Sequence, residues 1–214
     1  MFSSYRLTTL FALVLTVSSA LALTGCDGGS GNDAATAAPS VIAPGAPGER
    51  ATTLSADEAA KARPDDTPNA ADLTYVTNMI AHHQQALAMT ALADTYASDK
   101  RVRGLAGRID AAQGPEIESM EAWLKTNGKG AHAPGHDHAA MPGMATAAQL
   151  AALREARGAE FDRQFLSLMI THHQGAVTMA TDVLTQGRNV QVGEWANEVI
   201  AQQSAEIARM RAMG

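Results

Sequence analysis

The stretch DLTYVTNMIAHHQQALAM, residues 72–89, returns 90 positions later as DRQFLSLMITHHQGAVTM, residues 162–179. Eight of the 18 positions are identical, and they include every His and Met of the first copy. The shared donors are Met79, His82, His83 and Met89, and then Met169, His172, His173 and Met179. Core packing alone accepts swaps among aliphatic side chains. The retained imidazoles and thioethers therefore indicate a need for nitrogen and sulfur donors, which bind soft or borderline transition metals.

The same offset continues downstream of the repeated segment. Gln113, Glu116 and Met120 recur without a gap as Gln203, Glu206 and Met210. A period this long indicates a duplicated supersecondary unit rather than a short solenoid repeat. The unit is predicted to be a helix pair, with repeats at about 68–126 and 147–214.

Hydrophobic periodicity predicts helices over about 68–97, 100–126, 147–186 and 190–213, and no convincing strand pattern is visible. Thr67 is expected to cap the first helix, with Pro68 at its first position. A kink is expected at Pro115 and a break at Gly158. Two duplicated helix pairs predict an all-α fold, a ferritin-like antiparallel four-helix bundle over residues 67–214.

The N-terminal residues predict export. Arg6 precedes an apolar run at 7–23, typical of a signal peptide over residues 1–25, and a transmembrane anchor is the alternative. The following Leu-Thr-Gly-Cys26 resembles the lipobox of bacterial lipoproteins, which implies lipidation of Cys26. We therefore expect an exported protein that is lipid-anchored to a membrane and faces the periplasm or the cell exterior.

The segment after this cysteine, residues 26–66, is rich in Gly, Ala and Pro and is predicted to be a flexible tether. Within it, Ser55 and Glu58 have the spacing of a capping box, which predicts a short helix ended by Pro64. Cys26 is the only cysteine in the chain, so metal binding must rely on His, Met and carboxylates. The net charge of −6 without a basic stripe argues against a nucleic-acid partner.

The repeated donors fall on two faces of a helix. Residues four apart lie on one face, so Met79 shares the inner face with His83, while His82 and Met89 share a flank. If the two repeats face each other about a pseudo-two-fold axis, the donors of both copies could converge. The alternative is one core histidine per helix with methionine as filler.

A second donor cluster lies in the linker between the repeats, residues 128–145. It contains His132, His136, His138, Met141 and Met144. A short tract rich in His and Met is typical of metal binding, although a solvated His-rich loop is the alternative. Imidazole combined with thioether favours copper(I), with silver as a further soft ion and iron or manganese less favoured.

Glu116 and Glu206 occupy equivalent positions in the two repeats, each three residues after a glutamine. In an antiparallel bundle they could point inward, either as metal ligands or as acceptors that orient an imidazole N–H. The alternative is an ordinary exposed or capping glutamate.

Three motifs together carry a resemblance to a known family: Met-Ile-x-His-His-Gln-x-Ala-x-x-Met, Gln-x-x-Glu-Ile-x-x-Met and the linker's Met-Pro-Gly-Met. Over about residues 68–214 the chain resembles the bacterial domain-of-unknown-function family 305, also called the CopM-like family. The resemblance implies a ferritin-like bundle, an extracytoplasmic location and copper binding linked to copper tolerance. The ligands it implies are Met79, His82, His83, Met89, Met141, Met144, Met169, His172, His173 and Met179.

These observations favour a lipid-anchored protein that binds copper(I) for buffering, transfer or tolerance, with a copper-transfer protein as an expected partner. A ferritin-like iron or manganese redox enzyme is the first alternative. Its usual Glu-x-x-His motif occurs on none of the expected helices, and only Glu116 and Glu206 are candidate core carboxylates. We therefore predict no catalytic constellation. The second alternative is a structural or interaction module whose histidine pairs only pack.

Overall fold

The computed structural model describes residues 39–128 and 140–214. The chain divides into two compact units at the boundary between Ala62 and Arg63. Among the described residues, no helix is both long enough and apolar enough to span a membrane. The signal peptide, Cys26 and the linker histidines lie outside the described residues.

The described part of the first unit contains an antiparallel hairpin, β1 (Ser40–Ala43) and β2 (Thr52–Ser55), which the sequence analysis did not predict. The strands are four residues long and almost entirely exposed, so they carry little of the hydrophobic alternation that reveals a strand. The signal for their turn is Pro47-Gly48. Gly48 has φ +92° and the amide of Glu49 donates to the carbonyl of Ala46 at 2.8 Å, which makes a tight turn with glycine in its left-handed position.

Helix α1 (Ala56–Ala62) follows β2 directly. The predicted capping box is confirmed, because the carboxylate of Glu58 accepts from the backbone N–H of Ser55 at 2.8 Å and from its hydroxyl at 2.7 Å. The amide of Glu58 in turn donates to the hydroxyl of Ser55 at 3.3 Å. The helix ends before Pro64, as expected.

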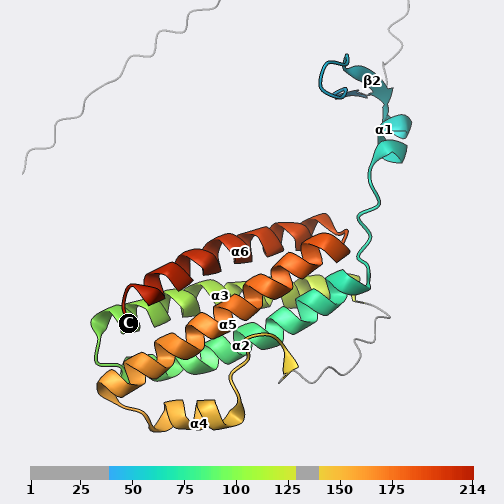
Figure 1. Ribbon diagram of the computed structural model, residues 1–214. Helices are drawn as coiled ribbons and strands as arrows, with labels where there is room; N and C mark the ends of the chain where they lie inside the picture. Colours follow the sequence, from blue (N-terminus) through green and yellow to red (C-terminus); the bar gives the residue numbers. More distant parts are fainter. Residues whose placement is uncertain (1–38, 129–139) are drawn as a thin grey trace, which may run out of the picture. The chain divides into compact units, whose positions relative to one another are not determined.

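The second unit is a bundle of four long helices, which confirms the predicted fold. They are α2 (Ala70–Tyr96), α3 (Lys100–Asn127), α5 (Gly158–Gln186) and α6 (Val190–Arg211). Helix α2 packs on α3, α5 packs on α6, and α2 packs on α5 (Figure 1). The short helix α4 (Ala147–Glu155) contacts both α2 and α5.

Two local expectations are settled by these boundaries. Helix α2 is capped by Asn69 and not by Thr67, because Asn69 and Asp72 form a reciprocal capping box that Thr67 has no partner to match. The expected break at Gly158 is confirmed, since α4 ends before it and α5 begins there. Pro115 lies inside α3, which continues to Asn127, and the kink expected there stays a prediction.

Two buried aspartates hold the helix pairs together about a pseudo-two-fold axis. Asp162, at the start of α5, accepts from the amides of Ser98 at 3.1 Å and Asp99 at 2.9 Å, in the α2–α3 loop. Asp72, at the start of α2, accepts from the amides of Arg188 and Asn189, both at 3.3 Å, in the α5–α6 loop. These six residues form three pairs at the offset of 90. Each helix pair therefore binds the other's loop, which fixes α2 and α5 as antiparallel neighbours.

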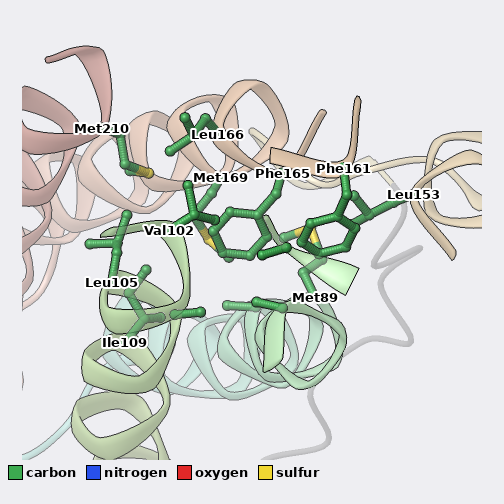
Figure 2. Packing of buried hydrophobic residues seen from close by; sticks show 14 of the residues in the cluster. Met89, Val102, Leu105, Ile109, Leu153, Phe161, Phe165, Leu166, Met169 and Met210 are labelled. Atoms are coloured by element: carbon green, nitrogen blue, oxygen red, sulfur yellow. The ribbon is translucent and has the colours of Figure 1, made fainter. Parts of the chain in front are cut away.

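The core consists of two apolar clusters with a polar layer between them. The first contains Met89, Leu105, Phe161, Phe165 and Met169 among others (Figure 2). The second, towards the other end of the bundle, contains residues from Tyr75 to Met79 of α2 and from Ala176 to Val183 of α5. On each long helix, the residues between the two clusters are the polar ones that the repeat retains.

Candidate metal centre

Eight side chains form what we call the polar layer, two from each long helix. They are His82, His83, Gln113, Glu116, His172, His173, Gln203 and Glu206. All except Glu116 are buried. Each helix presents the polar pair where its apolar stripe would otherwise continue, so the layer crosses the middle of the bundle.

His82 and His172, the first histidine of each His-His pair, meet at the centre of this layer. The ring centroids of His82 and His172 lie 3.7 Å apart with planes inclined by 35°. Both residues are at most 1% exposed. The prediction that the two repeats would face each other therefore holds for this pair, which the sequence places 90 residues apart.

The second histidine of each pair is held by a glutamate of the partner helix. His83 Nε2 lies 2.8 Å from the Glu116 carboxylate, and His173 Nε2 lies 2.7 Å from that of Glu206. A carboxylate in this position accepts the Nε2–H, which leaves the lone pair on Nδ1. This is the inward orientation considered for both glutamates. Pro115 does not prevent it, because α3 continues through the proline.

Five ring nitrogens of the polar layer have no hydrogen-bond partner in the part of the chain that the structure describes. They are Nδ1 of His82, His83, His172 and His173, and Nε2 of His172. A buried polar atom without a partner costs about 1–3 kcal/mol, so native proteins hold few of them. Their concentration in one layer makes this layer the candidate ligand site of the bundle.

Burial controls the protonation of the central pair. Loss of solvation lowers the pKa of His82 from 6.5 to about 4, although the hydrogen bond to the Pro142 carbonyl opposes this shift. Burial also holds the pKa of His172 well below its usual value, and the neighbouring histidines add to the effect. Both imidazoles are therefore neutral at pH 7, which is the state that binds a metal.

This protonation predicts an acid-sensitive fold for the metal-free protein. Unfolded, His82 takes up a proton below about pH 6.5, whereas the folded protein resists this until about pH 4. The contribution of neutral His82 to the free energy of unfolding is therefore fully present above pH 6.5 and is lost as the pH falls. At pH 4 this loss amounts to about 3 kcal/mol from His82 alone. Urea unfolding of wild type and His82→Leu between pH 7 and pH 4 measures the difference. Parallel pH profiles would contradict the proposed neutral state of His82.

The end of the linker packs against the bundle beside His82. His82 Nε2 donates to the carbonyl of Pro142 at 3.0 Å, and Gln85 binds both the N–H and the C=O of Ala145, at 2.7 and 3.0 Å. A tight turn forms over 141–144, with Gly143 at φ +79°. A Cβ on Gly175 would lie 2.0 Å from the Pro142 carbonyl, so the turn sits directly on α5 at this glycine.

The predicted methionine donors fall in three places. Met89 and Met169 lie among aromatic and aliphatic side chains of the first cluster, and Met79 and Met179 belong to the second (Figure 2). Met141 is 8% exposed and immediately precedes the proline that contacts His82. Met144 is half-buried at the end of the same turn. The structure thus brings the turn that carries the linker methionines against His82, whereas the helical methionines flank the polar layer within the apolar clusters.

Several residues of the site were not assigned a role from sequence. Gln113 and Gln203 are buried, and the Oε1 atom of each has no partner among the described residues. Their retention at the offset of 90 was the available signal. The contacts of Gln85 and Gly175 carried no signal, because these two residues occupy equivalent positions and differ. His132, His136 and His138 lie outside the described residues.

The side chains present limit which donor atoms could complete a metal site in the polar layer. Within residues 39–128 and 140–214, no three side chains of the His, Cys, Asp and Glu types converge closely enough to hold a metal ion. A metal in the polar layer would therefore need sulfur or amide donors beside imidazole. Sulfur favours soft ions.

A family model described as "Domain of unknown function (DUF305)" matches residues 72–214. The chain belongs to the DUF305 family. A crystal structure of a DUF305 fragment from Deinococcus radiodurans is 34% identical, with a TM-score of 0.62, and the match covers 68% of this chain and 95% of that one. A crystal structure described as "putative secreted protein DUF305" from Streptomyces coelicolor is 30% identical with a TM-score of 0.60, and the match covers 67% of this chain and 91% of that one.

A third solved relative of this DUF305 chain is CopM in a copper(I)-bound form. It is 32% identical with a TM-score of 0.56, and the match covers 66% of this chain and 94% of that one. CopM is also solved in copper(II)-bound and silver-bound forms. A comparison with curated proteins finds no match.

Proposed function

We propose that this chain is an extracytoplasmic protein that binds copper(I) within the polar layer of its bundle and buffers it or passes it on. The observation that carries the proposal is the set of five buried imidazole nitrogens without a partner. Such atoms are a cost to folding. Copper binding at the central pair would turn nitrogens of His82 and His172 into ligands. The copper- and silver-bound forms of the relative CopM support the same class of ion for this chain.

His82 and His172 are the principal ligands in this proposal. Their rings are in contact, both are neutral at pH 7, and the hydrogen bond from His82 Nε2 leaves its Nδ1 lone pair free. His83 and His173 offer Nδ1 in the same way, because their Nε2 atoms are held by glutamates. A carboxylate in this role fixes the tautomer of the imidazole and makes it a better donor.

Sulfur donors complete the site and select the ion. Met141 and Met144 are the proposed thioether donors, because their turn contacts His82. Thioether with imidazole favours copper(I) and silver over iron or manganese, which take carboxylates. Only two carboxylates reach the polar layer among the described residues, and each already accepts from a histidine. We therefore propose binding rather than redox catalysis.

The location and the partners follow from the N-terminal residues. We propose that Cys26 is lipidated and anchors the protein to a membrane, with the bundle facing the periplasm or the cell exterior. The linker histidines His132, His136 and His138 would then offer copper a first contact before the bundle, and a copper-transfer protein would be the partner for delivery.

Competition for copper(I) tests the proposal. The full chain is titrated against a chromogenic copper(I) chelator under reducing conditions, and we expect it to withdraw at least one copper ion. The variant with His82, His172, His83 and His173 changed to Ala should lose this competition, while Met141→Leu with Met144→Leu should weaken it. Circular dichroism confirms that each variant is helical. Wild-type affinity in the four-histidine variant would overturn the bundle site.

A further inference from the structure

The two halves of the polar layer differ in their access to solvent. A pocket of about 180 Å³ adjoins His83 on the face formed by α3 and α6. Its lining includes Tyr75, His83, Glu116, Ser119, Trp195 and Glu198. At its inner end, the side chain of Glu116 is 34% exposed and accepts from His83. The equivalent Glu206 side chain, which holds His173, is only 5% exposed.

The chemistry of the two faces differs in the same sense. At the offset of 90, the pocket residues Tyr75, Ser119, Trp195 and Glu198 are matched by Phe165, Arg209, Leu105 and Arg108. The pocket lining holds two carboxylates and no Lys or Arg. The equivalent positions keep one carboxylate, that of Glu206, and carry two exposed arginines. A duplication that keeps its histidines and glutamates has therefore diverged in charge around one of the two His–Glu pairs.

Two buried polar atoms also belong to residues of the pocket lining. The Tyr75 hydroxyl and His83 Nδ1 have no partner among the described residues, and Tyr75 is 4% exposed. Burial, reinforced by the charge of Glu116, raises the pKa of Tyr75, so its hydroxyl keeps its proton. The lone pairs of the neutral hydroxyl oxygen can contact a passing cation. Phe165 removes this oxygen at the equivalent position of the other repeat.

We infer that soft monovalent metal cations reach and leave the polar layer through this pocket, which we call the α3–α6 port, and not through the equivalent face beside Arg108 and Arg209. The inference rests on the proposed function. An acidic cleft raises the local concentration of cations and their association rate by 10-fold to 1,000-fold. The port leads to His83 through a half-exposed carboxylate.

Association kinetics test the port directly. Silver(I) alone is mixed with the full chain in a stopped-flow instrument, and binding is followed by the fluorescence of Trp195 and Trp123. The variant Ser119→Arg with Glu198→Arg introduces at the port the arginines that the equivalent face carries at Arg209 and Arg108. We expect association and dissociation to slow by on the order of tenfold, with an unchanged equilibrium affinity. Glu198→Gln is the milder variant and should slow association less, with the effect lost at high salt.

The matched control reverses the other face. Arg108→Glu with Arg209→Ser should leave the rate almost unchanged, because Phe165 and Leu105 still occupy the positions of Tyr75 and Trp195. Equal and opposite effects of the two double variants would show that only net charge matters and would overturn the port. Unchanged association in the port variants, with silver still bound, would overturn the port and leave the proposed function intact. A wild-type chain that binds neither silver nor copper would overturn both.

Discussion

Replacing His172 by leucine is expected to make the metal-free protein more stable and to make it a poor copper binder. Both ring nitrogens of His172 are buried without a partner in the described part of the chain, and the residue is 1% exposed. Leucine has a similar volume and no polar atom, so the substitution should raise the free energy of unfolding by about 1–3 kcal/mol. Urea denaturation of the metal-free protein measures this change, and the chelator competition measures the lost affinity.

His173 is the matched contrast, because it is the adjacent residue and equally buried. Its Nε2 holds the Glu206 carboxylate, so His173→Leu leaves a buried carboxylate alone and should lower the free energy of unfolding by about 3 kcal/mol. Two neighbouring histidines are thus expected to respond in opposite directions. If His172→Leu destabilises as much as His173→Leu, the unpartnered nitrogens are not a cost to folding, and the main support for the metal site is lost.

Removing both buried aspartates is expected to unfold most of the bundle. Asp162 accepts from the backbone of Ser98 and Asp99, and Asp72 accepts from that of Arg188 and Asn189. Each Asp→Ala change leaves part-buried backbone donors unpaired at a helix end, at a cost of about 3 kcal/mol. The two sites lie at opposite ends of the bundle, so their effects should add, and the sum approaches the whole stability of a typical domain.

Thermal unfolding of the single and double variants measures these effects. Asp182→Ala is the control, because Asp182 is an exposed aspartate on the same helix as Asp162, and its substitution should change the stability by less than about 0.5 kcal/mol. Asp→Asn at Asp72 and Asp162 should lower the free energy of unfolding by less than Asp→Ala, since the amide retains one acceptor oxygen. A loss below 1 kcal/mol for Asp162→Ala would contradict the proposed role of Asp162 in holding the α2–α3 loop.

The fold could be predicted because its signals are local and repeated. Apolar residues at helical spacing, the break at Gly158 and the repeat at 90 residues predict the four helices and their pairing. The N-terminal hairpin was missed, because its strands are short and exposed. The cap of α2 was misplaced at Thr67, because the choice of Asn69 depends on its reciprocal hydrogen bonds with Asp72.

The candidate site could be predicted only in part. Retention at equivalent positions identified the four bundle histidines and both glutamates. It did not separate methionines of the apolar clusters, such as Met89 and Met169, from the linker methionines, whose turn contacts His82. A repeat shows that a residue is retained, and packing and ligation both retain methionine. Met141→Leu with Met144→Leu in the copper(I) competition tests the ligand role of the linker methionines.

The sequence by itself determined the helices, their duplication and the kinds of donor atoms that the chain retains, because periodicity and repetition are properties of the order of residues. The tertiary structure alone decided which of those donors meet. Contact between His82 and His172, closure by the Pro142 turn and the unequal exposure of Glu116 and Glu206 depend on how the two repeats pack. Residues 60 or 90 positions apart become neighbours only when α2 and α5 are locked antiparallel by Asp72 and Asp162.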